Sequence, residues 1–455
     1  MNIQVKRIVQ RIRESYWLRS GALTFLQRFS VALFGFFSFV ILVRLLSVPD
    51  FGVWVLYTSF IAVIELLRGG FIKNPLTRRF LSTEPEEHTS VISAALLINL
   101  LLFLILSVGV VVLAEPVSIW MNAPALKVLC LLYIPNAFFS TFFLHYTTLH
   151  EAHLNFKASF WAYFTQKSLF FSYLLSIFFL GDSTTISLVD LAIAQIVATV
   201  ISCGISIWFA RKYAIHRLKW NRSHLLAMLN HGKYSFGTNV SSVLLNNIDS
   251  WMLGGMISPA AVAIYNPALR ITRLVEIPML SVAAITYPKL VQKGATPSLT
   301  NAKHLYEQSV AVILAIMIPI VFVAIVFANP IVVLIAGDNY EAAATVLQIT
   351  MLYGLLAPFN RQFGITLDAI GKANLGFYFV VASAVVNTIL NFIMIQRLGV
   401  IGAAYATTAT HVLDVILRQL FLRHILGTNF PGILQKTWFW YQLGIRRAIS
   451  FTSKR

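Results

Sequence analysis

Residues 90–113 read SVISAALLINLLLFLILSVGVVVL, a stretch of 24 residues without a charged side chain. A helix that crosses the hydrocarbon core of a bilayer needs about 20 mostly apolar residues, so this stretch predicts a membrane-spanning helix. Apolar stretches of similar length recur along the 455 residues, of which 58% are hydrophobic and 11% charged. Because an ordinary soluble domain carries about 25% charged residues, this composition excludes soluble enzymes, disordered chains and disulfide-rich secreted proteins.

On either side of residues 90–113, further apolar ranges predict an all-α, polytopic membrane protein with about twelve transmembrane helices. Turn-forming residues such as Pro116, Pro259 and Pro330 separate these ranges. The predicted spans are residues 23–46, 51–67, 90–113, 125–149, 156–180, 186–210, 236–257, 261–288, 308–328, 344–370, 375–396 and 401–422.

The cations are distributed unevenly between the segments that connect these spans. The chain has 35 Lys and Arg against 17 Asp and Glu, which gives a formal net charge of +18. Both termini and every second connecting segment hold 26 of the cations, whereas the alternate segments hold one, Arg397. Since Lys and Arg are retained on the cytosolic side, this pattern predicts an inner-membrane protein with both termini in the cytosol, and a nucleic-acid partner is not expected.

The two halves of the chain share weak internal similarity. Ala114–Pro116 and Ala328–Pro330 end the third and ninth spans at an offset of 214 residues, and two further matches have offsets of 211 and 218. Six spans per half predict two six-helix lobes related by a parallel repeat, as in transporters that rock about a central site. The predicted organisation is a basic N-terminal segment 1–22, an N-lobe 23–210, a cytosolic linker 211–235, a C-lobe 236–422 and a basic cytosolic tail 423–455.

Ionisable residues deep in the predicted spans are functional candidates, because an unpaired charge in hydrocarbon costs several kcal/mol. The deep cations are Arg28, Lys167, Arg270, Arg273 and Arg361, and the central acids are Asp249 and Glu276. Five cations against two acids predict either a hydrated cavity that an anion enters or a structural network of ion pairs. A guanidinium binds two phosphate oxygens at once, so a cavity of this kind favours a phosphate-bearing substrate over a cationic drug.

Other polar residues have simpler interpretations. Glu65 and Arg68 are spaced for a salt bridge at the cytosolic end of the second span, and Asp414 and Arg418 for mutual neutralisation in the twelfth. His150-Glu151-Ala152-His153 has the wrong spacing for a metal motif, so neither a metal site nor a cofactor is expected. Four tyrosines are predicted to pack in the core or to stack on sugars: Tyr57, Tyr163, Tyr265 and Tyr353.

Several short motifs resemble those of a known transporter family. Leu45–Trp54 (LLSVPDFGVW) resembles the first hairpin of polysaccharide and O-antigen flippases, and Ala263–Arg270 (AIYNPALR) resembles the start of their eighth span. Tyr287–Leu290 (YPKL) is similar to the end of that span, and Gly337–Ala343 (GDNYEAA) is similar to an outer loop. This family belongs to the multidrug/oligosaccharidyl-lipid/polysaccharide exporter superfamily, with multidrug and toxin extruders and lipid II flippases.

The resemblance implies that the chain flips an undecaprenyl-pyrophosphate-linked oligosaccharide from the cytosolic to the outer leaflet by alternating access. It places Arg28 and Arg270 where the family has arginines, and it implies membrane lipid, a polysaccharide polymerase and a chain-length regulator as partners. Asp249 and Glu276 are candidate coupling groups for Na⁺ or H⁺. Two alternatives stay open: a cation-coupled multidrug exporter of the same superfamily, and a membrane glycosyltransferase or polymerase. No catalytic residue is predicted, since no ATP-binding motif or suitable acidic base is found.

Overall fold

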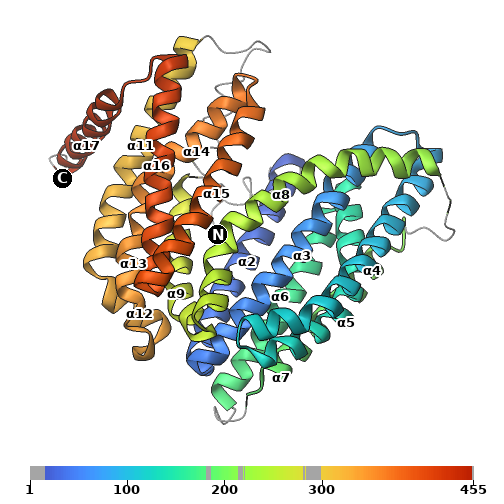
Figure 1. Cartoon of the computed structure of the whole chain (residues 1–455). Coiled ribbons are helices and arrows are strands. Elements are labelled where there is room, and N and C mark those ends of the chain that lie inside the picture. Colours follow the sequence, from blue (N-terminus) through green and yellow to red (C-terminus); the bar gives the residue numbers. More distant parts are fainter. Residues whose placement is uncertain are drawn as a thin grey trace. The chain divides into compact units, whose positions relative to one another are not determined.

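Every regular element that the structure describes is a helix (Figure 1). The computed structural model describes residues 16–180, 186–213, 221–279 and 299–452, together with 219 and 282. No strand occurs among these residues, so the all-α prediction is confirmed. The YPKL motif, most of the predicted N-terminal segment and part of the predicted linker lie outside the described residues.

The chain forms two compact units, Met1–Val243 and Leu244–Arg455. In unit 1, α2 packs against α6, and α5 packs against α3, α4 and α7. The helix α8 begins in unit 1 and ends in unit 2. The helices of unit 1, with α8, are α2 (Tyr16–Leu45), α3 (Val48–Leu81), η1 (Pro85–Glu87), α4 (His88–Trp120), α5 (Pro124–Ala152), α6 (Phe156–Leu180), α7 (Leu188–Ala210) and α8 (Arg222–Met256).

In unit 2, α11 packs against α14 and α17, while α16 packs against α13, α14 and α15. The helices are α9 (Pro259–Thr272), η2 (Arg273–Val275), α11 (Leu299–Val326), α12 (Ala328–Ala336), η3 (Asp338–Tyr340), α13 (Ala343–Met351), α14 (Tyr353–Ala369), α15 (Ala373–Leu398), α16 (Val400–Leu426) and α17 (Phe430–Thr452). The predicted boundaries of lobes and linker stay predictions.

Each of the twelve predicted spans overlaps at least one of these helices. Eight helices of the described chain are long and apolar enough to cross a bilayer, or nine if the bent pair α13 and α14 forms one span. Large side chains such as Leu104, Val108 and Val112 on α4 are exposed, as expected of a surface that contacts lipid. The chain is therefore a multi-pass membrane protein, and twelve spans stay a prediction.

The predicted single span 344–370 is broken in the structure. α13 and α14 meet at Leu352 with a bend of 42°. Pro358, inside α14, has no N–H to donate to the carbonyl of Gly354, and its ring crowds that carbonyl. The Gly354 carbonyl therefore lacks its helical hydrogen bond, and this loss accounts for a bend between α13 and the start of α14.

The second helix is longer than the predicted span 51–67. α3 continues without interruption to Leu81, and Ile72, Leu76 and Phe80 are buried at a spacing of four residues. Arg68 and Lys73 therefore lie within this helix. Most of the predicted tail forms the helix α17, which begins after Gly427, whose φ of 68° ends α16 in the left-handed conformation.

Candidate functional site

The carboxylate of Asp249 is the centre of a buried polar cluster in unit 2. Asp249 lies on α8, and three side chains from three other helices donate hydrogen bonds to it. Tyr265 Oη of α9 lies 2.9 Å away, Thr407 Oγ1 of α16 2.7 Å and Asn391 Nδ2 of α15 2.6 Å. Asp249 thus connects four helices through one carboxylate.

Oxygen atoms dominate this cluster. Asn391 Nδ2 also donates to the backbone carbonyl and Oδ1 of Asn387, at 3.0 and 3.1 Å. Asn391 Oδ1 is buried and has no hydrogen-bond partner among the described residues. A carboxylate surrounded by amide, hydroxyl and backbone oxygens offers the ligands that a small hard cation takes in transporters. The arrangement suits the binding of Na⁺ or of a proton.

The predicted cations of unit 2 lie on neighbouring elements. Arg270 lies in the last turn of α9 and Arg273 begins η2, so the two exposed arginines are one helical turn apart. Glu276 directly follows η2, and Arg361 lies on α14. With Asp249 these five predicted residues belong to unit 2, and their joint site stays a prediction.

The second predicted ion pair of unit 2 is confirmed and is structural. Arg418 Nη2 lies 3.0 Å from Asp414 Oδ2, and Ser383 also donates to Asp414. The Arg418 guanidinium faces the rings of Phe363 and Phe379, with distances of 5.4 and 6.0 Å to their centroids. Buried against aromatic rings and its own carboxylate, Arg418 is not available to a substrate.

In unit 1 a buried ion pair organises the contact between α3, α4 and α5. Arg68 Nη1 lies 3.1 Å from Glu65 Oε1, and Arg68 Nη2 donates to Thr141 Oγ1 at 2.7 Å and Asn99 Oδ1 at 3.2 Å. Arg68 is 0% exposed. The predicted pairing of Glu65 with Arg68 is confirmed, and α3 extends 13 residues beyond Arg68. The place of this pair at the cytosolic end of the second span stays a prediction.

A polar cavity of about 310 Å³ lies beside this ion pair. Lys167, a predicted site residue on α6, lines it together with Lys73 of α3 and Glu65. The Lys73 ammonium lies 6.0 Å from the centroid of Tyr163, another lining residue. Arg28 is exposed on α2 and does not line this cavity.

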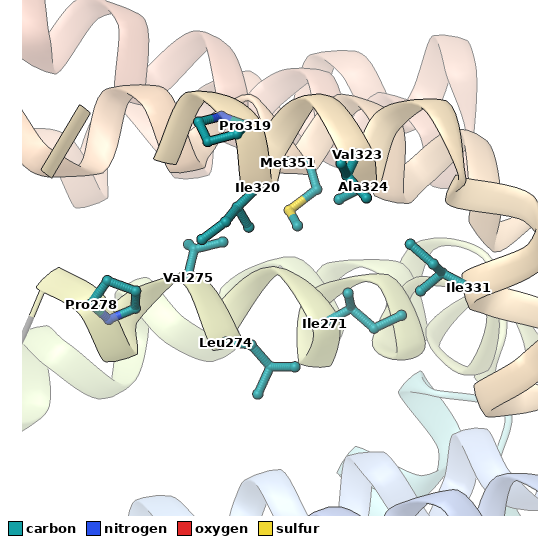
Figure 2. Close-up of a pocket in the computed structure, with 10 residues that line it drawn as sticks. All are labelled: Ile271, Leu274, Val275, Pro278, Pro319, Ile320, Val323, Ala324, Ile331 and Met351. Carbon is teal, nitrogen blue, oxygen red and sulfur yellow. The ribbon is translucent and has the colours of Figure 1, made fainter. Parts of the chain in front are cut away.

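A second cavity, in unit 2, is apolar. It has a volume of about 470 Å³, and Figure 2 shows its lining side chains on two helical segments and around Ile331, with Ile320 and Val275 between the two segments and Leu274 directed away from the upper one. Ile271 and Leu274 lie beside Arg270 and Arg273 in the chain. The cavity therefore adjoins the arginine-bearing segment but contains no charged residue.

A family model for polysaccharide biosynthesis proteins matches residues 41–345, which is more than half of the chain. The chain belongs to this family. The probable low-salt glycan biosynthesis flippase Agl15 of Haloferax volcanii is 24% identical over 223 residues, covering 49% of this chain and 47% of that protein. The teichuronic acid biosynthesis protein TuaB of Bacillus subtilis is 24% identical over 298 residues, covering 60% and 59%. The chain thus spans about half the length of the curated relatives it matches.

Solved structures show the fold of this polysaccharide biosynthesis protein. The lipid II flippase MurJ in an inward closed conformation has a TM-score of 0.74 at 15% identity, covering 92% of this chain and 90% of that chain. An inward-facing multidrug resistance MATE family transporter of the MOP superfamily has a TM-score of 0.73 at 15% identity, covering 87% and 94%. At such low identity the likeness shows the fold alone, which is that of MurJ and MATE transporters.

The predicted site residues of this polysaccharide biosynthesis protein are divided between the two units. Arg270, Arg273, Arg361, Asp249 and Glu276 belong to unit 2, whereas Arg28 and Lys167 belong to unit 1. That all five cations share one cavity stays a prediction. Tyr57 and Tyr265 are buried and pack in the core.

Sequence reasoning missed Lys73 and the partners of Asp249. Lys73 was assigned to a cytosolic segment by its charge, although Ile72, Leu76 and Phe80 continue the helical apolar pattern past it. That pattern is the signal by which Lys73 is found. Asn391 and Thr407 lie 142 and 158 residues from Asp249 in the chain, and a single sequence carries no signal that joins them.

Proposed function

We propose that this protein flips a polyprenyl-pyrophosphate-linked oligosaccharide, such as an O-antigen or another surface polysaccharide unit, from the cytosolic to the outer leaflet by alternating access. Membership of the polysaccharide biosynthesis family, with relatives that are named flippases, carries this proposal. The multi-pass helical fold supports it, because a lipid-linked sugar needs a polar path through the bilayer. A transporter of this kind moves its substrate without chemical change, so we assign no catalytic residue.

We assign the pyrophosphate to the exposed arginines. Arg270 and Arg273 stand one turn apart, where the Cβ atoms of residues three apart are separated by about 5–6 Å. Two planar guanidinium groups at this spacing match two linked phosphoryl groups. Arg361 extends the proposed cationic surface within unit 2, and the apolar cavity beside Arg270 suits the polyprenyl chain.

We assign cation coupling to Asp249. Its carboxylate and the unpartnered Asn391 Oδ1 together support a Na⁺ or proton site, and Tyr265 connects this carboxylate to α9, whose last turn carries Arg270. Binding of the cation and of the anionic headgroup then influence each other reciprocally. Glu276, which directly follows η2, is the second candidate charge partner.

The proposal places the protein in the inner membrane with both termini in the cytosol, where the lipid-linked unit is presented. The N-lobe 23–210 and the C-lobe 236–422 would be the two rocking bodies. A polysaccharide polymerase and a chain-length regulator are the proposed partners on the outer side.

Charge reversal tests this function. In cells that depend on this protein for a surface glycan, Arg270→Glu or Arg361→Glu should reduce glycan export at least tenfold at unchanged protein level, because a carboxylate repels the pyrophosphate. Arg397→Glu, a reversal at the exposed end of α15, should leave export unchanged. Normal export in both arginine variants would exclude the proposed site. Drug resistance on overexpression, without glycan export, would favour a multidrug exporter instead.

A further inference from the structure

The polar cavity of unit 1 is a site that the proposed flipping mechanism leaves unused. It lies among α3, α5, α6 and α7, and at about 310 Å³ it is at the small end of the roughly 300–1,000 Å³ of ligand sites. Its polar lining consists of charged, amide and hydroxyl side chains. Among these are Glu65, Lys73, Asn136, Gln166, Lys167 and Gln195.

Positive charge is in excess at this cavity. Neither Lys73 nor Lys167 has a carboxylate oxygen within 4.0 Å in the described part of the chain. The carboxylate that lines the cavity is already engaged, because Glu65 Oε1 accepts from Arg68, from Tyr133 Oη at 2.6 Å and from Ser140 Oγ at 2.8 Å.

The wider surroundings do not remove this excess. Glu65 is the carboxylate among the lining residues, and Arg68 is its ion-pair partner. Lys73 and Lys167 thus share the cavity with a carboxylate that is already paired. Two ammonium groups at one small cavity indicate an anionic ligand, since such charges are costly away from water unless they are balanced.

The neutral lining suits a sugar ring. Asn136 lines the cavity and is 8% exposed, and its Oδ1 has no hydrogen-bond partner among the described residues. Gln166 Nε2 is 3.3 Å from Thr199 Oγ1, and Gln195 lies nearby on α7. Amides and hydroxyls pair with sugar hydroxyls, and the rings of Tyr163 and Phe170 provide flat faces for a pyranose.

We propose that this unit 1 cavity binds an acidic sugar residue of the translocated glycan, with its carboxylate held by Lys73 and Lys167. The inference rests on the proposed function and narrows its substrate class to glycans that carry a uronic-acid type of sugar. Lys167 then has a different role from the predicted arginines. The two lysines bind the carboxylate of the acidic sugar, and the arginines bind the pyrophosphate.

The test measures binding to the purified full-length protein in detergent. Sodium D-glucuronate is titrated calorimetrically, and D-glucose with sodium chloride at equal ionic strength and inorganic phosphate are titrated in parallel. Glucuronate should bind and glucose should not. Lys73→Gln and Lys167→Gln should each weaken glucuronate binding about tenfold, since each removes a charged hydrogen bond.

Two control variants keep the result interpretable. Lys157→Gln changes an exposed lysine of the same helix α6 and should bind glucuronate like the wild type. Lys167→Arg keeps the charge and should retain most of the affinity, which separates loss of charge from loss of fold. Binding of phosphate but not of glucuronate would overturn the sugar assignment in favour of a lipid headgroup, and unchanged glucuronate binding in both glutamine variants would overturn the site.

Flipping of a lipid-linked glycan in proteoliposomes, measured with the same variants, distinguishes the two proposals. If the wild type flips the glycan and the glutamine variants flip the acidic glycan as fast as the wild type does, the sugar site fails while the function stands. If the wild type flips neither glycan, the function itself fails.

Discussion

Arg68 is the largest fully buried side chain in the described part of the chain. Its guanidinium joins α3 to α4 through Asn99 and to α5 through Thr141, while it neutralises Glu65. A charge in such a place is stable only with its partners, because the cost of desolvation is large. The network therefore holds the Glu65 side chain in place where it lines the polar cavity, and it does so without a ligand.

Replacing Arg68 tests this role. Arg68→Ala should destabilise the protein by about 3 kcal/mol, because Glu65 is left without its ion pair and Asn99 and Thr141 lose a donor. The measurement is the thermal unfolding of the purified protein in detergent. Arg78→Ala, an exposed arginine of the same helix, should unfold like the wild type. Equal unfolding temperatures of all three proteins would show that the network contributes nothing.

Asp249 provides the second test at the scale of the residue. A cation that binds only the folded protein raises its stability with increasing concentration. Replacing choline chloride by sodium chloride should therefore stabilise the wild type but not Asp249→Asn. Na⁺ should also stimulate transport by the wild type, by roughly 5–150-fold for a typical coupling, and this stimulation should be absent in Asp249→Asn. Asp338→Asn, an exposed carboxylate of η3, is the matched control. Sodium stabilisation that persists in Asp249→Asn would exclude this carboxylate as the Na⁺ ligand.

At the scale of the element, hydropathy predicted the spans well because burial in lipid is a property of each segment by itself. Residues 90–113 have no charge, and α4 covers them completely. Elements that depend on tertiary contacts were missed. The extension of α3 packs Ile72 and Leu76 in the core of unit 1, and α17 covers one side of α11, so neither is visible as a long apolar run.

α17 depends on a few contacts with α11. Ile433 is fully buried, Tyr441 Oη donates to the carbonyl of Ala315 at 2.8 Å, and Lys436 Nζ lies 2.6 Å from Glu307. Glu307 is 4% exposed and also accepts from the backbone N–H of Asn429. Its carboxylate therefore depends on Lys436 for its counter-charge.

Removing that counter-charge should loosen α17. Lys436→Ala leaves a buried carboxylate with one backbone donor, which should weaken the docking of α17 by about 2 kcal/mol. Hydrogen exchange of the amides of residues 433–443 should then be faster by roughly 30-fold, since each 1.4 kcal/mol is about tenfold. Gln435→Ala changes an exposed neighbour on the same helix and should leave exchange as in the wild type. Unchanged exchange in Lys436→Ala would mean that apolar packing alone holds α17.

At the scale of the whole molecule, the charge count predicted orientation from loops, and the structure changes which cations belong to them. Arg68 and Lys73 lie inside α3, as do Arg78 and Arg79 in its last turn. Even without these four, twenty-two cations remain at the predicted cytosolic segments against one, Arg397, at the other side. The predicted orientation thus does not depend on the cations of α3, whereas the candidate site gains one of them, Lys73. Composition alone does not distinguish a cation in a cytosolic connecting segment from a cation that lines a cavity.

Cysteine labelling in intact cells tests this orientation. Cys130 and Cys203 lie within the helices α5 and α7, so Cys130→Ser with Cys203→Ala gives a background without thiols. In that background, Asp338→Cys should react with a membrane-impermeant maleimide, because its exposed segment η3 is predicted to face outward. Glu86→Cys, exposed in η1, should react only after the membrane is permeabilised, because it follows the basic end of α3 on the cytosolic side. The reverse pattern would invert the protein in the membrane and, with it, the direction of the proposed transport.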